Sequence, residues 1–286
     1  MAQHNADRPD WNGQSGERWI VHQAQLDARL AVFGEAAIEA TAAAGERVLD
    51  VGCGAGSSSL ALAARVGAGG QVLGLDISEP LIARARALAP QDMPVVFRVA
   101  DACSAELPEG AFDILFSRFG VMFFGDPTGA FAHMRRRAQA GRAGRFRLLA
   151  RRGRERLDAP ADGRDQRHRR APTAPPDPEA PGPFSFGDPK RVGRILTAAG
   201  FTNIAIEPFD ALAPFGVGAA RDAAIDDAVK MAIEVGPLSR VLADQPDDIR
   251  ARASAAVRAA FAGRPGERSL MIESATWIVT ARNPAS

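Results

Sequence analysis

Glycines at alternate positions follow a short apolar segment and form the most chemically suggestive pattern in this chain. The segment 48–51 is typical of a buried strand carrying one acid, Asp50, and the segment 57–64 is typical of the start of a helix. The residues between them are Gly52, Cys53, Gly54, Ala55 and Gly56. A strand that turns into a helix over glycines presents backbone N–H groups and the positive helix end to a ligand, and glycines allow its close approach. The pattern predicts a site for a nucleotide-like ligand.

Acidic residues follow the next two strand-like segments. Asp76 lies about twenty residues beyond the glycines, where a carboxylate can accept both hydroxyls of a ribose; the alternative is a cap for the next helix. Asp101 ends the following segment, where it can accept the amine of an adenine while Ala102 leaves room for the ring; the alternative is a turn-forming aspartate. Ligands of open α/β sheets bind beyond the carboxyl ends of the strands, which favours the binding roles. For Asp50 we expect bonds to the loop amides or to the charged end of the ligand.

The elements that must hold these residues alternate between strand and helix. The expected strands are 47–51, 71–77, 95–99 and 112–117, and the helices between and after them are 57–66, 80–88 and 126–136. A helix over 19–43 precedes them, and a helix at 189–199, a strand at 203–206, a helical region at 219–262 broken near 236–237 and a closing strand at 275–281 follow. Such alternation implies right-handed crossovers and parallel strands. We predict an α/β fold: a doubly wound, Rossmann-like and mostly parallel sheet with helices on both faces and a helical cap.

The composition argues against membrane spans, disulfides and structural metal. No apolar run approaches the roughly 18 residues that cross a bilayer, and the first residues are too polar for a secretory signal, so we expect a cytoplasmic protein. Cys53 and Cys103 fall in segments of the predicted cleft, and two cysteines with four histidines are too few for a zinc site. His22 and His133 are expected to have packing or surface roles. We assign no catalytic residue.

Four motifs occur in order, and together they resemble the motif set of class I S-adenosylmethionine-dependent methyltransferases. They are VLDVGCGAG (48–56), LDIS (75–78), VADA (99–102) and FDILFSRFGVMFFGDP (112–127). The resemblance is close over about residues 10–135 and looser over about residues 176–284. It is nearest to the small-molecule group that includes ubiquinone/menaquinone-biosynthesis-like enzymes.

The resemblance implies a binding site for S-adenosylmethionine and a neighbouring site for a methyl acceptor. The implied cofactor-binding residues are Asp50, Gly52, Cys53, Gly54, Gly56, Asp76, Ile77, Asp101, Ala102 and Ser117, the last of them behind the sulfonium. Arg118, Phe119 and Met122 would face the acceptor. Trp11, Trp19 and Gln23 would lie over the cofactor, or else pack a leading helix. A sulfonium methyl is already activated, so the chemistry needs in-line alignment and exclusion of water but no metal, and a general base only for a hydroxyl acceptor.

An arginine-rich stretch interrupts this pattern. Residues 135–170 hold 14 arginines and four acidic residues, a net charge of +10 in a chain whose total is +1. Only 146–150 could form a strand there, and family-like sequence resumes near Pro175. Four explanations are open: a basic arm for nucleic acid, a disordered linker, a lineage-specific insertion, or a stretch translated in the wrong frame between two compensating indels. We favour the last, because GC-rich codons out of frame yield Arg, Ala, Gly and Pro; one clean reading frame across codons 135–175 would exclude it.

These inferences divide the chain into four parts and favour one function. The parts are an N-terminal helical segment over the cofactor site (1–45), the cofactor-binding half (46–135), the arginine-rich stretch (136–176), and a C-terminal half with the helical cap and closing strand (177–286). We expect methyl transfer to a small molecule, with no nucleic-acid partner, since the remainder of the chain is acidic. The alternatives are a cofactor-binding protein without catalysis, an RNA methyltransferase using the basic arm, and an NAD(P)-dependent oxidoreductase. The last would need G-x-G-x-x-G, whereas Ser57 stands at the third position.

Overall fold

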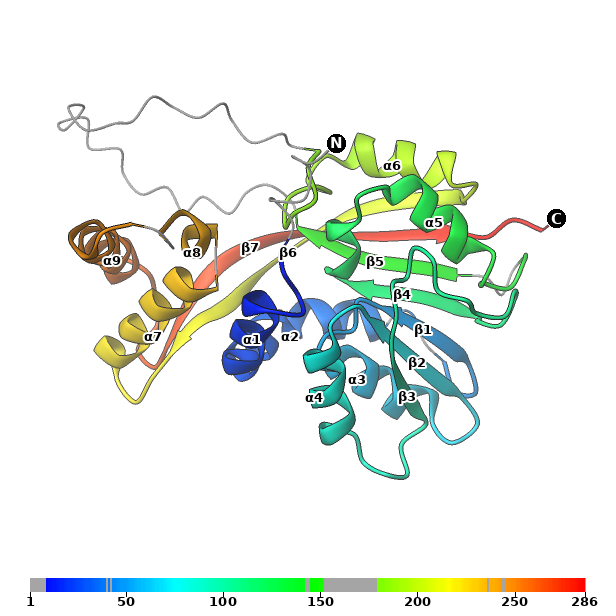
Figure 1. Ribbon diagram of the computed structural model, residues 1–286, viewed down its shortest axis with the longest axis horizontal. Coiled ribbons are helices and arrows are strands. Elements are labelled where there is room, and N and C mark those ends of the chain that lie inside the picture. Colours follow the sequence, from blue (N-terminus) through cyan, green and yellow to red (C-terminus); the bar gives the residue numbers. More distant parts are fainter. Residues whose placement is uncertain are drawn as a thin grey trace.

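A seven-stranded sheet organises the part of the chain that the computed structural model describes, residues 9–39, 41, 43–141, 145–151, 179–235, 237–242 and 245–285. Its strands are β1 (Arg47–Val51), β2 (Gln71–Asp76), β3 (Val95–Val99), β4 (Ile114–Arg118), β5 (Arg145–Arg151), β6 (Thr202–Val217) and β7 (Ser269–Arg282). Their order in the sheet is β3-β2-β1-β4-β5-β7-β6 (Figure 1). The first five strands in this order are parallel, and β7 runs antiparallel to both of its neighbours. The predicted mostly parallel α/β sheet is confirmed.

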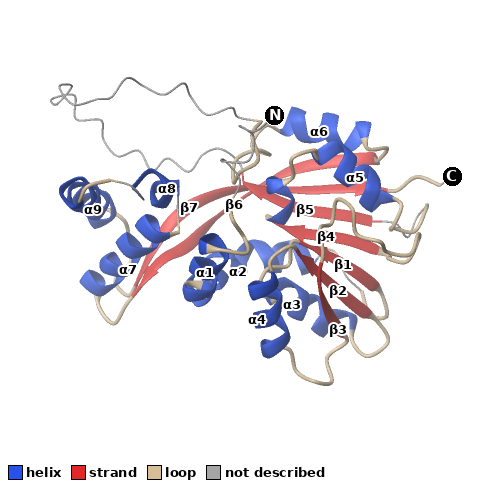
Figure 2. Ribbon diagram, viewed as in Figure 1, coloured by secondary structure: helices blue, strands red, loops and turns tan. Residues whose placement is uncertain are grey.

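Helices lie on both faces of this sheet (Figure 2). They are α1 (Gln14–Val21), α2 (Gln23–Glu39), α3 (Ser57–Val66), α4 (Glu79–Leu88), α5 (Pro127–Arg135), α6 (Pro189–Ala198), α7 (Arg221–Glu234), α8 (Pro237–Leu242) and α9 (Asp247–Ala262), with a 3-10 turn at Gly120–Phe123. The connections through α3 (from β1 to β2) and α4 (from β2 to β3) lead toward one edge of the sheet. The connection through α5 (from β4 to β5) leads toward the other edge. Because crossovers are right-handed, opposite directions place these helices on opposite faces. The contacts agree, since α2 packs against α3 and α5 packs against α6.

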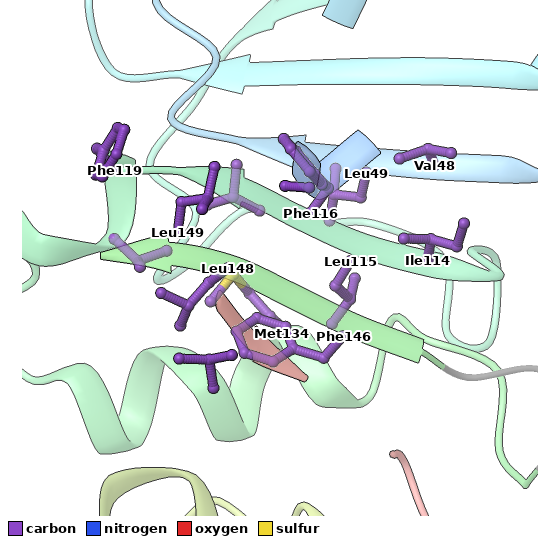
Figure 3. Close-up of a cluster of buried hydrophobic side chains, with 14 of the residues drawn as sticks. Val48, Leu49, Ile114, Leu115, Phe116, Phe119, Met134, Phe146, Leu148 and Leu149 are labelled. Carbon is purple, nitrogen blue, oxygen red and sulfur yellow. The ribbon is translucent and has the colours of Figure 1, made fainter. Parts of the chain in front are cut away.

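The core is densest where the central strands bury both of their faces. Val48 and Leu49 on β1, and Ile114, Leu115 and Phe116 on β4, are at most 1% exposed (Figure 3). Central parallel strands are continuous apolar runs because helices cover them on both sides. Each buried aliphatic or aromatic side chain contributes about 1.5–3 kcal/mol. This centre holds the carboxyl ends of β1 and β4 side by side, where the functional loops begin.

The arginine-rich stretch contributes a strand inside the sheet, and this strand includes residues 146–150, which could form one by their sequence. β5 pairs in parallel with β4 and antiparallel with β7. Its four apolar side chains are at most 3% exposed: Phe146, Leu148, Leu149 and Ala150. Acidic groups oppose the positive charge of two of its arginines. Arg145 forms an ion pair with Glu46. Burial lowers the pKa of Arg147, and the negative charge of Glu207 opposes that shift. The four explanations concern residues 135–170, of which 142–144 and everything from 152 onward lie outside the described residues.

The last two strands form a ribbon that is much longer than predicted. A strand at 203–206 was expected, whereas β6 continues to Val217 through Pro208 and Pro214. Proline cannot donate a hydrogen bond to a neighbouring strand and is therefore confined largely to edge strands. β6 is the edge strand of this sheet, which is why it continues through both prolines. β7 pairs along it and also extends beyond the predicted 275–281.

The far half of this ribbon carries the helical cap, α7, α8 and α9 (Figure 1). The predicted break is confirmed, since α7 ends at Glu234 and α8 begins at Pro237. A second apolar cluster joins the ribbon and the cap; its buried members include Phe215, Ala228, Met231, Phe261 and Leu270. None of the helices among the described residues is long and apolar enough to cross a membrane.

The leading helix is two helices rather than the single one predicted over 19–43. α1 ends at Val21, and the backbone of His22 leaves helical geometry with φ −100° and ψ 14°. The His22 side chain is 3% exposed, and its Nε2 lies 2.7 Å from Oε2 of Glu234 on α7. The break therefore places a buried imidazole that ties the N-terminal helices to the cap.

Candidate functional site

A cavity of about 880 Å³ opens at the carboxyl ends of the central strands. Its walls are the glycine turn after β1, the ends of β2 and β4, the loop after β3, the N-terminal helices and the cap. Pockets for drug-sized ligands measure about 300–1,000 Å³, so this one is in the upper part of that range. Twelve of the site residues proposed from sequence line it: Trp11, Trp19, Gly52, Cys53, Gly54, Asp76, Ile77, Asp101, Ala102, Arg118, Phe119 and Met122. Asp50, Gly56 and Ser117 do not line it.

The three glycines of the turn do different things, although all have positive φ. At Gly52 (φ +69°) a Cβ would lie 2.7 Å from Cα of Gly120, so the turn after β1 packs directly on the loop after β4. At Gly56 (φ +89°) a Cβ would lie 2.8 Å from the Phe97 ring. At Gly54 (φ +56°) nothing is within 4 Å, and this residue faces the cavity. Gly52 and Gly56 thus serve packing, and Gly54 leaves space for a ligand.

The end of β2 holds the glycine turn in place by accepting hydrogen bonds from the backbone amides of the turn. The N–H groups of Gly52 and Cys53 donate to the carbonyl of Leu75 at 2.8 and 3.0 Å. The N–H of Gly54 donates to Oδ2 of Asp76 at 2.8 Å. These three amides therefore shape the turn, and the Asp76 carboxylate is one of the polar groups of this region that line the cavity.

Asp76 and Asp101 each hold a turn by accepting a backbone N–H, and each can still accept hydrogen bonds from a ligand. Oδ1 of Asp76 accepts the Ser78 N–H at 2.9 Å, and Oδ1 of Asp101 accepts the Cys103 N–H at 2.8 Å. The turn considered as the alternative for Asp101 is thus present, whereas the N-cap of α4 is Ser78, whose hydroxyl accepts the Leu81 N–H, and Asp76 holds the turn before it. A carboxylate has about four lone-pair sites, so acceptor capacity remains on both residues. Burial raises the pKa of Asp76, against the hydrogen bonds from Ser78 and Gly54 that stabilise its charge.

Asp50 is fully buried beneath the turn. Its Oδ2 accepts the hydroxyls of Ser58 and Ser59 at 2.7 and 2.6 Å, so it bonds to α3 rather than to the loop amides. Its Oδ1 has no hydrogen-bond partner among the described residues. Burial raises the pKa of Asp50, while the serine hydrogen bonds and the charge of Arg118 act in the opposite direction. A buried oxygen without a partner costs about 1–3 kcal/mol or more, a cost that a cationic group nearby can offset.

Asp50→Asn is expected to stabilise the protein at neutral pH. An acid whose pKa is raised by folding contributes stability below its unfolded pKa, and that contribution is lost as pH rises through the raised pKa. Charged Asp50 therefore destabilises the fold at pH 7.5. Asparagine keeps an acceptor for both serines and should raise the free energy of unfolding by about 1–3 kcal/mol.

Urea unfolding between pH 4 and pH 8 measures this effect, and the gap between Asp50→Asn and the parent should shrink toward pH 4. Asp92→Asn, at an exposed position before β3, is the control and should show no such trend. An Asp50→Asn protein less stable than the parent at pH 7.5 would contradict the prediction.

Two residues at the end of β4 set the shape of the cavity wall. Ser117 is fully buried, and its hydroxyl donates to the carbonyl of Val51 at 2.8 Å, which joins β4 to β1 behind the wall. Phe119 has φ +64°, a conformation that is strained for an aromatic residue. Its ring is 8% exposed and meets Phe33 edge to face with centroids 6.4 Å apart. The strained turn at Phe119 brings Gly120 into contact with the glycine turn. Nothing in the local sequence indicates this contact.

Arg118 lies beside the glycine turn, although the sequence places it on the acceptor side. Its Nη2 is 2.6 Å from Oγ of Ser57, the first residue of α3, and 3.3 Å from Oδ1 of Asp27 on α2. Its side chain is 12% exposed. The pair places one cation and one carboxylate at the N-terminus of α3, an arrangement that complements the two charges of an amino acid group.

An aromatic cluster from the N-terminal segment covers one side of the cavity. Trp11 meets Trp19 and Phe123 edge to face, with centroids 5.7 and 5.2 Å apart. The Ser78 hydroxyl donates to the carbonyl of Trp11 at 2.6 Å and ties this segment to the turn after β2. Gln23, also expected over the cofactor, does not line the cavity. The N-terminal segment therefore closes the cavity through its tryptophans.

The opposite wall comes from α2, β6 and the cap, which the motifs do not single out. Its residues include Leu26, Asp27, Arg29, Leu30, Phe215, Met231, Ala232, Glu234, Val235 and Leu238. They are spread over more than two hundred positions and meet only because the ribbon carries α7 over α2. No local signal in the sequence could have grouped them.

The surroundings of the Cys53 thiol and the His133 imidazole limit what these two groups at the cavity can do. Cys53 is 4% exposed, and burial raises the pKa of its thiol well above the usual value, which excludes a thiolate nucleophile at neutral pH. Nε2 of His133 lies 3.0 Å from the carbonyl oxygen of Ala105. Among the described residues no three His, Cys, Asp or Glu side chains gather as metal ligands.

The polar groups of the cavity fit S-adenosylmethionine. Asp76 and Asp101, at the ends of the adjacent strands β2 and β3, would accept the ribose hydroxyls and the adenine amine. Arg118 and Asp27 would face the carboxylate and the ammonium of the methionine end. Gly54 leaves space for the part of the cofactor between its two ends. The donors and acceptors thus follow the order of the groups along the cofactor.

Comparisons with known proteins agree with this fit. Residues 48–141 match a family model described as a methyltransferase domain. Aklanonic acid methyltransferase of Streptomyces sp. (strain C5) is 38% identical over 90 residues, which are 31% of this chain and 41% of that protein. Demethylmenaquinone methyltransferase of Thermus thermophilus is 36% identical over 92 residues, which are 32% of this chain and 41% of that protein. The match thus spans well under half of each relative.

A solved structure shares the fold over most of the chain. SpnF, a (4+2)-cyclase, aligns with a TM-score of 0.51 and 23% sequence identity, covering 92% of this chain and 83% of that one. At that identity the likeness concerns the fold alone. The family model, the sequence relatives and the sheet topology together support a class I S-adenosylmethionine-dependent methyltransferase domain over residues 48–141.

Proposed function

We propose that the protein transfers a methyl group from S-adenosylmethionine to a small-molecule acceptor by in-line displacement. The observation that best supports this is a single cavity bounded by the glycine turn on one side and by a largely apolar wall from α2, β6 and α7 on the other. The names of the two relatives described above give a small molecule as the compound that is methylated. A cofactor and an acceptor would meet between these two walls.

The chain's part in the reaction is to align the two molecules and to exclude water. Bound S-adenosylmethionine supplies an activated methyl group on its sulfonium. Phe119 and Met122 line the cavity and are only 8% and 2% exposed, so they would help to keep water away from the reacting groups. The cluster of Trp11, Trp19 and Phe123 closes the N-terminal side. Alignment of the reactants in a dry cavity can supply most of the rate enhancement. An acceptor that reacts as an anion or a neutral amine needs no general base.

Calorimetry of the full chain with S-adenosylmethionine and S-adenosylhomocysteine tests the cofactor part of the proposal. Both should bind at one site, and NADH should not compete. A folded protein that binds neither compound would overturn the proposal.

A screen of phenols, quinols, amines and carboxylates tests transfer, with release of S-adenosylhomocysteine measured by mass spectrometry. At least one acceptor class should be methylated. Binding of both cofactor forms without turnover of any acceptor would instead favour a cofactor-binding protein without catalysis.

A further inference from the structure

The cap has an apolar cluster of its own and is carried by a two-stranded ribbon (Figure 1). From Thr276 onward β7 pairs with both β5 and β6, whereas from Ser269 to Ala275 the described residues pair it with β6 alone. A two-stranded ribbon twists more and is less stable by itself than strands with neighbours on both sides. The cap can therefore move as one body on this ribbon.

One polar pair joins the cap to the N-terminal helices. His22, between α1 and α2, has a side chain that is 3% exposed, and its Nε2 lies 2.7 Å from Oε2 of Glu234. Glu234 is the last residue of α7 and lines the cavity. Hydrogen bonds to a carboxylate are stronger than those between neutral groups. The pair forms only while the cap lies against the N-terminal helices, so it favours that arrangement.

The pair lies at the boundary between two walls of the cavity. Leu26 and Leu30 on α2 line one wall, and Met231 and Ala232 on α7 line the other. All four side chains are buried, so the two walls lie close together. A ligand between two such walls enters and leaves more readily when they separate. Movement of α7 away from α2 would open this half of the cavity, and it would break the pair between His22 and Glu234.

We propose that the cap is a gate over the half of the cavity assigned to the acceptor, and that the His22–Glu234 pair is the latch that keeps this gate closed. The inference rests on the proposed function where it assigns this half to an acceptor. Both residues of the latch are positioning residues, since they act through the cap and not on the reacting atoms. Breaking the latch should increase the open fraction of the protein without unfolding the cap.

Cysteine labelling on α7 tests the latch without any ligand. Ala232→Cys places a thiol in the cavity wall. Its matched control is Ala228→Cys, one turn earlier, at a fully buried position of the cap that does not line the cavity. Both proteins are treated with methyl methanethiosulfonate at pH 7.5, and the modified residue is located by mass spectrometry. The rate at a buried thiol follows the fraction of molecules in which it is exposed.

Adding Glu234→Ala should make labelling at position 232 about tenfold faster and leave position 228 unchanged. The loss of one hydrogen bond to a carboxylate predicts an effect of about this size. Glu234→Gln should label more slowly than Glu234→Ala, because its amide oxygen still accepts a hydrogen bond from Nε2 of His22. Lys230→Ala removes an exposed charge from the same helix and should change nothing.

An engineered metal bridge tests the gate in the closing direction. Glu234→His would place a second imidazole opposite His22, and a pair of imidazoles can bind Ni²⁺. Ni²⁺ should then slow labelling at position 232 to the parent rate or below, and EDTA should reverse this. The Ala232→Cys protein without Glu234→His measures any effect of Ni²⁺ on the thiol itself.

Three outcomes would overturn the inference. Equal labelling of position 232 with and without Glu234→Ala would remove the latch. Faster labelling of both positions would show that the pair only stabilises the cap. Bound Ni²⁺ that leaves labelling as fast as in Glu234→Ala would contradict the gate. Should Ala232→Cys fail to fold, Leu30→Cys on the opposite wall is measured by the same criteria.

Failure of the proposed function has a different signature. It appears as a parent chain that does not bind S-adenosylhomocysteine, and it leaves the labelling results standing because no ligand takes part in them.

Discussion

Replacing Asp76 with alanine is expected to weaken binding of S-adenosylhomocysteine by about 100-fold or more. The carboxylate holds the glycine turn through the Gly54 N–H and the next turn through the Ser78 N–H. We propose that its remaining lone pairs accept the ribose hydroxyls. Hydrogen bonds to a charged group contribute about 1.5–3 kcal/mol each, and every 1.4 kcal/mol or so is a factor of about ten in affinity. Losing two of them therefore predicts an effect of this size in calorimetry.

The matched control for this variant is Asp92→Ala, which removes an exposed aspartate before β3 and should leave the affinity unchanged. Asp76→Asn should bind more weakly than the parent and more tightly than Asp76→Ala, because an amide oxygen still accepts the Gly54 N–H. A folded Asp76→Ala protein with the affinity of the parent would remove Asp76 from the cofactor site.

Gly52→Ala is expected to be the most destabilising of three glycine substitutions at positive φ. A Cβ there would meet Cα of Gly120 at 2.7 Å, a contact between two backbones that no rotamer change relieves. The left-handed conformation costs alanine about 1–2 kcal/mol, and overpacking adds about 1–3 kcal/mol. Urea unfolding should therefore show a loss of about 2–5 kcal/mol. Because the turn must move away from β4, cofactor binding should fall as well.

Two further variants separate the causes of that loss. At Gly110, with φ +61° and nothing within 4 Å, alanine should cost only the left-handed conformation, about 1–2 kcal/mol, and leave binding intact. At Gly54 the same stability cost is expected, but the new Cβ enters the cavity and should weaken S-adenosylhomocysteine binding by about tenfold or more. Equal destabilisation by Gly52→Ala and Gly110→Ala would show that the contact with Gly120 is unimportant.

Local signals in the sequence were enough for the cofactor-binding half of the fold. The observed bounds of β1, α3 and β3 agree with the predicted 47–51, 57–66 and 95–99. Two Asp-Pro pairs begin helices, and the side chains of Asp126 and Asp188 accept N–H groups of the first turn. Apolar runs, glycines and caps act within a few residues of each other, so the sequence displays them directly.

The parts that were predicted poorly depend on distant partners. β6 continues through two prolines because it is an edge strand. The leading helix breaks at His22, where a buried imidazole meets Glu234 more than two hundred residues away. Arg118 bonds to Ser57 on α3 and to Asp27 on α2, contacts that its own segment does not reveal. In each case the deciding contact comes from another part of the chain.

The sequence by itself determined the family and the groups that fit the cofactor, because the glycine turn, Asp76 and Asp101 follow consecutive strands of a parallel sheet and must meet at one edge. Only the tertiary structure decided what each of these groups does there. It assigned Gly52 to packing against Gly120 and Gly54 to the open cavity, and it left one oxygen of Asp50 without a partner among the described residues. It also built the second wall, where Arg29 stacks on Phe215, because the ribbon of β6 and β7 carries the cap over α2. Local patterns specify elements and their order, whereas a pocket is made by side chains that only the packing of those elements brings together.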